Sequence, residues 1–167
     1  MEYGLSLGSN LGDRLQNLRA ARDCILALPG VALLAQSPVY DTEPVGVRPE
    51  HARLTFLNAV LVIAAPPEPA ALARELRALE AELGRRRTAD RYAPRPIDID
   101  LLYAEGRRLS GAELTLPHER WSQRRFVAQP LCDVRPDLVL PGESRTVREV
   151  LLALPEQPRV IFLTVCW

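Results

Sequence analysis

The sequence predicts an α+β fold in which an antiparallel sheet carries two helices on one face. Between Glu2 and Tyr103, apolar residues recur at strand or helix spacing in the order strand, helix, strand, strand, helix, strand. Proline and glycine residues separate these segments. This order suits a split βαβ sandwich. No linker, repeat or low-complexity tract interrupts the chain, so we expect residues 1–167 to form one domain.

The first half of the chain supplies three of the strands and one helix. The strands are expected at Glu2–Leu7, Val31–Tyr40 and Thr55–Ala65, and the helix between Leu11 and Leu28. A turn at Gly8-Ser9-Asn10 opens the helix, and Pro29-Gly30 ends it. Residues 41–53 contain two prolines and a glycine, which exclude regular structure and predict a mobile loop.

The second helix and the last strand of the predicted core follow Ala65. The helix opens at a group of prolines, repeats leucine at positions 72, 76, 79 and 83, and is capped by Gly84. A strand over Ile97–Tyr103 then points Ile97, Ile99, Leu101 and Tyr103 into the core. An irregular extension follows, with a short helix after His118, a helix capped by Thr146 and Glu149, and a strand over Val160–Val165.

Composition narrows the classes of function. The net charge is zero, which argues against a dedicated duplex nucleic-acid binder. The chain has no lysine, so all 21 basic residues are arginine. This excludes a P-loop lysine, a protein-kinase lysine and Schiff-base chemistry. The three cysteines are far apart and odd in number, which predicts neither a disulfide framework nor a zinc site. We expect no secretion signal, no membrane span and a cytoplasmic protein.

Two aspartates in the Ile97–Tyr103 strand are the first candidate site. Residues two apart in a strand face the same side, so Asp98 and Asp100 point together. Two adjacent carboxylates repel unless a cation lies between them, and Mg²⁺ is commonly bound by one or two carboxylates together with substrate phosphates. The pair therefore predicts a magnesium site, although an isolated Asp-x-Asp is more often a pair of solvated carboxylates.

The loop before this strand strengthens the magnesium interpretation. It is crowded with arginine, at positions 85, 86, 87, 91 and 95. The guanidinium group presents a rigid fork of donors that matches phosphate oxygens. Such a run alone indicates a solvated surface or an RNA-facing patch. Beside two carboxylates, it favours binding of a nucleoside triphosphate with Mg²⁺.

Two further segments give weaker signals. His118 begins a basic stretch that also contains Arg124, and it is either a turn residue or a donor to phosphate. Phe56 and Asn58 alternate onto one strand face, where a flat heterocycle could stack on the ring and be read by the amide. A core phenylalanine beside an edge asparagine is the simpler interpretation of this pair.

Taken together, these segments resemble the 6-hydroxymethyl-7,8-dihydropterin pyrophosphokinase family of folate biosynthesis. The likeness runs from Gly8-Ser9-Asn10 to about Leu131 and is most specific in Arg-x-Ala-Pro-Arg-x-x-Asp-x-Asp-Leu-Leu, over Arg91–Leu102. It implies a ferredoxin-like βαββαβ core, two Mg²⁺ ions and ATP as co-substrate. It also implies attack of the pterin hydroxymethyl oxygen on the β-phosphorus, with release of AMP.

The resemblance also assigns residues by position. It implies that Arg85, Arg95, Asp98 and Asp100 are catalytic, and that the two aspartates are the metal ligands. It implies that ATP is bound by Glu80, Arg85, Arg87, Arg91, Tyr92, Arg95, Leu101, Leu114, Thr115, His118 and Arg124. It implies that the pterin is bound by Gly8, Thr42, Val45, Phe56, Asn58 and Phe126.

The alternative from another class is a ferredoxin-like RNA-binding module that uses the arginine loop. Aromatic residues make up only 5% of the chain, and no aromatic–glycine strand of the RNA-binding type is visible. We therefore expect a monomeric enzyme with small-molecule substrates and no nucleic-acid or membrane partner.

Overall fold

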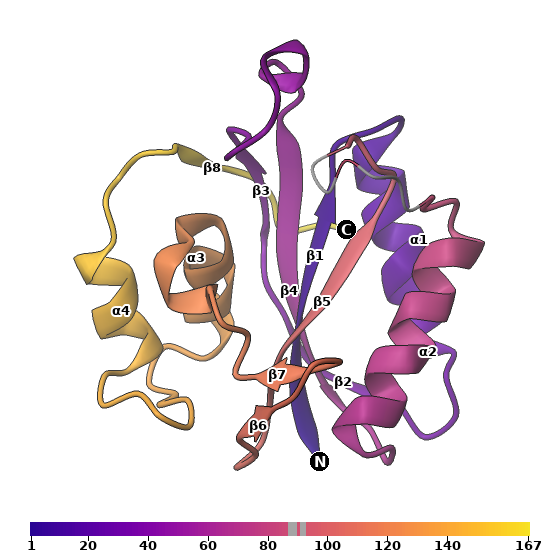
Figure 1. Ribbon diagram of the computed structural model, residues 1–167, viewed down its shortest axis with the longest axis vertical. Helices are drawn as coiled ribbons and strands as arrows, with labels where there is room; N and C mark the ends of the chain where they lie inside the picture. The colour runs from indigo at the N-terminus through magenta and orange to yellow at the C-terminus, as the bar shows by residue number, and fades with distance from the viewer. Residues whose placement is uncertain (87–89, 91–92) are drawn as a thin grey trace.

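A computed structural model of the protein describes residues 1–86, 90 and 93–167. A central sheet separates two layers of helices (Figure 1). α1 (Arg14–Leu26) and α2 (Pro69–Glu82) cover one face, while α3 (Arg125–Val134) packs on the other with α4 (Val147–Ala153) outside it. The mixed helix and antiparallel-sheet fold is confirmed, but helices cover both faces of the sheet rather than one. No helix in the described ranges is long and apolar enough to span a membrane.

Every strand pair in the main sheet is antiparallel. Among the described residues this sheet has six strands, in the order β5-β1-β4-β3-β8, with β2 also beside β4. The strands are β1 (Glu2–Ser9), β2 (Ala32–Gln36), β3 (Val39–Thr42), β4 (Phe56–Ala64), β5 (Asp98–Ala104) and β8 (Val160–Thr164). β5 therefore forms one edge of the sheet, and β8 forms the other.

The first strand ends later, and the first helix begins later, than the turn at Gly8-Ser9-Asn10 predicted. β1 continues through Ser9, and α1 begins only at Arg14, because the Asp13 side chain accepts a hydrogen bond from the Gln16 amide at 3.0 Å and caps the helix there. Leu11, which we expected on the buried face of the helix, is 47% exposed. The predicted start at Leu11 was therefore wrong by one turn.

The predicted strand over Val31–Tyr40 is two strands, β2 and β3. The Ser37 amide and hydroxyl both bond the main chain of Val60, and Pro38 then brings no N–H group to continue the ladder. β3 runs on through Thr42, so it takes the first two residues of the expected loop. The rest of the loop contains one 3₁₀ turn, η1 (Pro49–His51).

A bulge in β5 explains why Tyr103 faces the side of the sheet opposite to the one predicted. Leu101 pairs with Leu5, but Tyr103 pairs with Gly4, so Leu102 is an extra residue between them. Ile97, Ile99 and Leu101 join the core under α1 and α2 as predicted, whereas Tyr103 joins the core under α3. Its ring occupies the space over Gly4, where an added Cβ would lie 2.1 Å from the ring.

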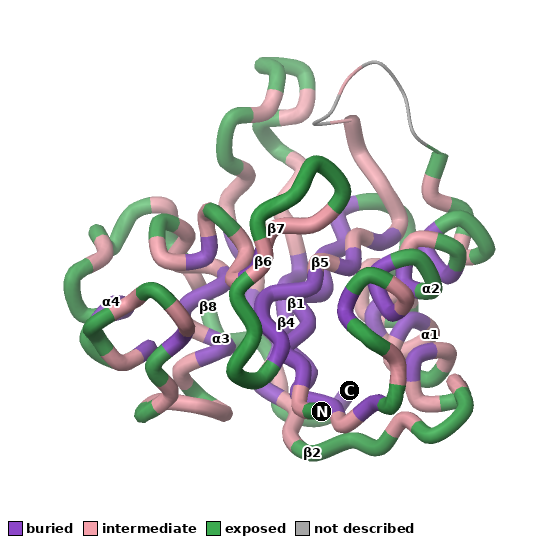
Figure 2. The backbone as a smooth tube through the Cα atoms, turned by 60° about the horizontal axis from the view of Figure 1, so that its bottom comes forward, coloured by how far each residue is buried: buried purple, intermediate pink, exposed green. Residues whose placement is uncertain are grey.

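The segment after β5 is more regular than expected. A hairpin of β6 (Leu109–Ser110) and β7 (Thr115–Leu116) follows β5. The predicted helix after His118 is confirmed: a 3₁₀ turn, η2 (Trp121–Gln123), leads into α3. The capping box at Thr146 and Glu149 and the final strand β8 are confirmed. Apolar side chains of this segment pack against the second face of the sheet. The central strands are buried along much of their length (Figure 2).

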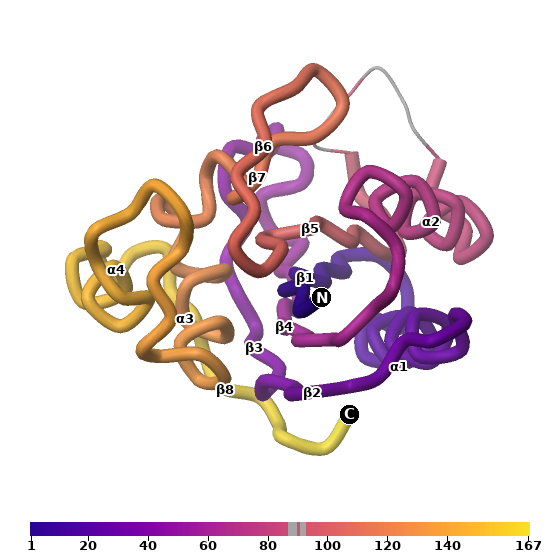
Figure 3. Tube along the Cα trace, turned by 90° about the horizontal axis from the view of Figure 1, so that it is seen from below, coloured from indigo at the N-terminus to yellow at the C-terminus, as the bar shows by residue number. Residues whose placement is uncertain are grey.

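The last residues of the chain are anchored beside the junction of β2 and β3 (Figure 3). The Trp167 side chain is 6% exposed, and its indole N–H donates to the Ser37 carbonyl at 2.7 Å. The Trp167 main-chain oxygen accepts from Gln36 at 3.1 Å and from Arg22, whose guanidinium also lies 5.7 Å from the indole ring. These contacts hold β8 against β3.

Replacing Trp167 by Ala should lower the free energy of unfolding by about 3 kcal/mol, because a buried aromatic ring and an indole hydrogen bond are lost together. Urea unfolding monitored by circular dichroism measures this change. Leu152→Ala, at a position 79% exposed, is the control and should stay within about 0.5 kcal/mol of the parent chain. Equal effects of the two substitutions would contradict the anchor.

Candidate functional site

The described site residues gather around the end of the sheet where β1, β4 and the edge strand β5 lie side by side. Gly8 of β1 lies between Asn58 of β4 and Asp98 of β5 in the strand register. An added Cβ at Gly8 would come within 3.0 Å of the Asn58 side-chain oxygen and 3.9 Å of the Asp98 Cβ. Glycine at this position therefore keeps open the space between the amide and the carboxylate.

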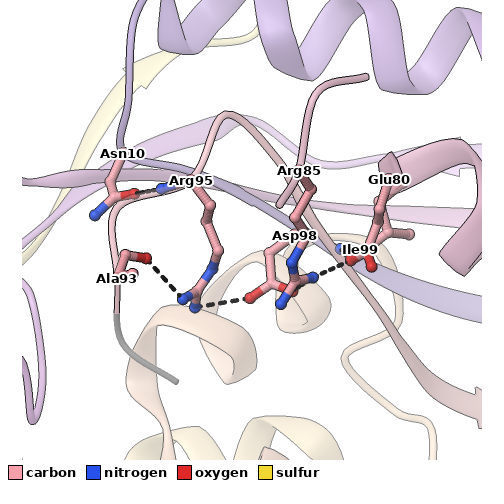
Figure 4. A network of polar contacts seen from close by, with 7 residues as sticks. All are labelled: Asn10, Glu80, Arg85, Ala93, Arg95, Asp98 and Ile99. Carbon is pink, nitrogen blue, oxygen red and sulfur yellow. Dashed lines mark hydrogen bonds and ion pairs between the residues drawn. The ribbon is translucent and has the colours of Figure 1, made fainter. Parts of the chain in front are cut away.

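The Asp98 carboxylate is shared by two arginines (Figure 4). Its Oδ2 accepts from Arg95 Nη2 at 2.8 Å, and its Oδ1 accepts from Arg85. The Arg85 guanidinium also donates to Glu80 of α2, so Arg85 links α2 to the edge strand β5. Asp98 is only 18% exposed, and the two guanidinium groups balance its charge within the site.

Glu80 is buried beside the ion pair of Arg85 and Asp98. Its side chain is 3% exposed and accepts a hydrogen bond from the Ile99 amide at 2.7 Å. Burial raises the pKa of Glu80 to about 7, against the opposing effects of the Ile99 hydrogen bond and the Arg85 charge. Glu80 thus fixes Arg85 from the side of α2.

The second carboxylate lies in a different environment. Asp100 pairs with Ser6 of β1, and burial together with the charge of Asp98 raises its pKa above the ordinary value. Burial and the charges of Arg124 and Arg120 lower the pKa of His118, against the opposing effect of Asp100. The His118 Nδ1 accepts from the Arg120 main-chain N–H at 3.2 Å, a bond that requires this ring nitrogen to carry no proton.

Two cavities lined by described residues meet at this cluster. Both are lined by Arg95, Asp98 and Asp100. The larger holds about 740 Å³ and lies over the edge of the sheet. Among the predicted ATP ligands it brings together Glu80, Arg85, Leu101, Leu114, Thr115 and His118. The smaller is lined by all six predicted pterin ligands, namely Gly8, Thr42, Val45, Phe56, Asn58 and Phe126.

Some assigned residues fall elsewhere. Arg124, expected beside ATP, lines the smaller cavity, and its guanidinium lies 5.6 Å from the Phe126 ring. Arg87, Arg91 and Tyr92 lie outside the described residues.

The smaller cavity has two aromatic walls and one fixed amide. Phe56 comes from the start of β4, and the Arg95 guanidinium lies 5.5 Å from its ring. Phe126 comes from the first turn of α3. The buried Asn58 amide donates to the Thr42 hydroxyl at 2.6 Å, so its Nδ2 is engaged and its Oδ1 lies on the side of Gly8. The cavity can therefore hold a flat ring and bond its polar edge.

Glu43 and Asn10 are among the polar residues at or beside the site that sequence reasoning missed. Glu43 lines the smaller cavity and accepts from the Arg159 amide at 3.1 Å, just before β8. Asn10 accepts a hydrogen bond from the Arg95 amide at 2.8 Å. The turn that contains Asn10 is visible in the sequence, but its contact joins residues 85 positions apart, which no local pattern reports.

The carboxylate oxygens of the site suit a hard divalent cation whose remaining ligands come from the phosphates of a bound substrate. In the described ranges, no group of three or more histidine, cysteine, aspartate or glutamate side chains could hold a metal by itself. Asp98 and Asp100 both line the two cavities and offer carboxylate oxygens only. Mg²⁺ commonly takes one or two carboxylates and obtains its other ligands from phosphates and water, so these residues fit it.

Comparison with known proteins identifies the relatives of the chain. The family model described as 7,8-dihydro-6-hydroxymethylpterin-pyrophosphokinase (HPPK) matches residues 4–136. A 2-amino-4-hydroxy-6-hydroxymethyldihydropteridine pyrophosphokinase of Methylorubrum extorquens is 42% identical over 90% of this chain and 91% of its own length. A protein of the same name from Porphyromonas gingivalis is 43% identical over 79% of this chain and 89% of its own.

Larger proteins contain a similar unit. The folic acid synthesis protein fol1 of Schizosaccharomyces pombe is 35% identical, but the chain spans only 20% of its length. An HPPK-DHPS crystal structure in complex with substrates matches 90% of this chain and 42% of its own, at 14% identity and a TM-score of 0.67. This last likeness concerns the fold. These comparisons give no support to the RNA-binding alternative.

The two aspartates should respond differently to the loss of their charge. Asp98→Asn should lower the free energy of unfolding by about 2 kcal/mol, because two largely buried guanidinium groups lose their shared carboxylate. Asp100→Asn should leave it equal or higher at pH 7. The raised pKa of Asp100 means that the folded state disfavours the ionised form above the unfolded pKa.

Thermal and urea unfolding of both variants at pH 7, without nucleotide or divalent metal, measure this difference. Equal losses of stability in the two variants would contradict the described charge distribution.

Proposed function

The chain belongs to the 7,8-dihydro-6-hydroxymethylpterin-pyrophosphokinase family, and we propose that its two joined cavities transfer pyrophosphate from ATP to 6-hydroxymethyl-7,8-dihydropterin in folate synthesis. The observation that carries this assignment is that the two cavities share one border. Most of the assigned nucleotide ligands line one cavity, the assigned pterin ligands line the other, and Arg95, Asp98 and Asp100 line both. Donor and acceptor substrates thus meet at the charged cluster.

The larger cavity is the ATP side of this proposal. Arg85, Arg95 and His118 present N–H donors toward a triphosphate, and Leu101 and Leu114 offer apolar surface to the nucleoside. Among the residues outside the described ranges, Arg87, Arg91 and Tyr92 remain assigned to ATP by the family resemblance. Asp98 and Asp100 would hold two Mg²⁺ ions, which supply positive charge to the phosphate oxygens when bound.

Binding of the triphosphate would exchange partners around Asp98. Phosphate oxygens compete with the carboxylate for Arg85 and Arg95, and release of these arginines frees both Asp98 oxygens for a cation. Glu80 keeps one contact with Arg85 during this exchange. The arginines therefore change from balancing a carboxylate to balancing the transferred group.

The smaller cavity is the pterin side. Phe56 and Phe126 would enclose the bicyclic ring, while Thr42, Val45 and Asn58 bond its polar edge. Arg95 borders both substrates, since its guanidinium lies over Phe56 and bonds Asp98. This arrangement directs the hydroxymethyl group of the pterin toward the triphosphate.

The reaction is a displacement at the β-phosphorus. The hydroxymethyl oxygen bonds this phosphorus as the bond to the oxygen shared with the α-phosphate breaks, and AMP leaves with that oxygen. The hydroxyl proton passes to solvent or to a phosphate oxygen. Because phosphoryl transfer depends mainly on positioning and charge neutralisation, the residues assigned here include no side-chain base, and neutral His118 serves as a donor to phosphate.

We extend the proposal to the architecture and setting of the protein. The βαββαβ core is ferredoxin-like, which the antiparallel strand order β5-β1-β4-β3 supports. Residues 1–167 form one domain, which the pairing of β8 with β3 supports, and we propose that it acts as a monomer. The three free cysteines favour a reducing, cytoplasmic setting, and we propose no nucleic-acid or membrane partner.

With ATP, Mg²⁺ and 6-hydroxymethyl-7,8-dihydropterin, we expect AMP and the pterin diphosphate in equal amounts and no ADP. Removal of Mg²⁺ with EDTA should stop the reaction. Asp98→Asn or Asp100→Asn should lower turnover about a hundredfold or more, because each removes charge from the metal site. Chromatography of the nucleotide products is the measurement. Formation of ADP or free phosphate would show that the reaction is assigned wrongly.

Nucleotide and pterin should bind in a coupled way, because Arg95 contacts the border of both cavities. We expect a non-hydrolysable ATP analogue with Mg²⁺ to raise the affinity for the pterin, and Arg95→Ala to weaken this effect. Calorimetric titration of the pterin with and without the analogue measures the coupling. Equal pterin affinities in the two titrations of the parent chain would rule it out.

A further inference from the structure

Arg95 lies between two prolines, which have no main-chain N–H group to hold the segment in place. The local sequence is Ala93-Pro94-Arg95-Pro96. From residue 94 to residue 96, the Arg95 amide is therefore the single main-chain donor. Whatever accepts from this amide determines where the segment lies and where the Arg95 side chain starts.

Asn10 forms hydrogen bonds with both the main-chain N–H and the main-chain carbonyl of Arg95; Figure 4 shows the two residues side by side. The Asn10 side-chain oxygen accepts from the Arg95 main-chain N–H at 2.8 Å. The Asn10 main-chain N–H donates to the Arg95 carbonyl at 3.3 Å. Asn10 itself is fixed, since it is 3% exposed and directly follows β1. The contact therefore joins the end of a central strand to the loop that carries Arg95.

We propose that Asn10 is a positioning residue for the pyrophosphoryl transfer and acts through Arg95. This inference rests on the proposed function, in which the Arg95 guanidinium borders both substrates. The guanidinium lies 5.5 Å from the Phe56 ring and bonds Asp98 Oδ2 at 2.8 Å. Both contacts require the main chain of Arg95 to stay in place, and Asn10 provides that restraint from across the site.

The other half of the Asn10 side chain points to the same role. Its Nδ2 is buried and has no hydrogen-bond partner among the described residues. A buried donor without a partner is unfavourable for stability, so it is the acceptor oxygen that gives an asparagine its value here. The turn around Asn10 is held by another residue, because Asn17 donates to the Leu11 carbonyl at 2.8 Å and to the Ser9 hydroxyl at 3.2 Å.

A double-mutant cycle tests the proposal. Asn10→Ala should lower kcat about tenfold with a smaller change in the KM for ATP, because the lost hydrogen bond positions a group rather than binding the nucleotide. In an Arg95→Ala background, Asn10→Ala should cause little further loss, since the residue it positions is already gone. Asn10→Asp keeps the acceptor oxygen but replaces the unpartnered donor by a second, charged oxygen at a buried position, so it should retain more of the kcat than Asn10→Ala in a chain that still unfolds normally.

Asn17→Ala is the matched control, because it loosens the same turn without touching residues 93–98. Its effect should add to that of Arg95→Ala. The proposal is overturned if the Asn10 and Arg95 substitutions act additively, or if Asn10→Asp loses as much kcat as Asn10→Ala while thermal unfolding stays normal. Formation of AMP by the parent chain in the same assay separates either result from a failure of the proposed function.

Discussion

The sharing of one carboxylate between two arginines is the interaction on which the site depends. Asp98 binds Arg85 on one oxygen and Arg95 on the other, and each arginine leads to a different part of the fold. Arg85 reaches Glu80 of α2, and Arg95 reaches the end of β1 through Asn10. The single carboxylate therefore connects the helix layer, the edge strand and the central strand at the border of the two cavities.

This arrangement requires both faces of the sheet to be covered. The face under α1 and α2 buries the alternate residues of β1 and β5, which fixes the direction in which Asp98 and Asp100 point. The face under α3 brings Phe126 to the same end of the sheet. β8 lies beyond the residues matched by the family model, yet it pairs with β3 up to Thr42 and so supports the residue that orients Asn58.

Local rules predicted what depends on local chemistry. Strand alternation correctly placed Asp98 and Asp100 on one face, and the capping box fixed the start of α4. The bulge at Leu102 was not predictable, because an extra residue in one strand is visible only against its partner. The contact of Asn10 with Arg95 is likewise set by the folding of β1 beside β5, and a pattern within ten residues cannot report it.

The absence of lysine gives the charged cluster its character. The Arg85 Nη1 donates to both Glu80 and Asp98, and the guanidinium group carries further N–H groups in the same rigid plane, whereas an ammonium group is a compact point charge. A residue with two acceptors can exchange one of them for a phosphate oxygen and keep the other. In the proposed function, Arg85 would therefore gain a phosphate partner without leaving Glu80 as an isolated buried charge.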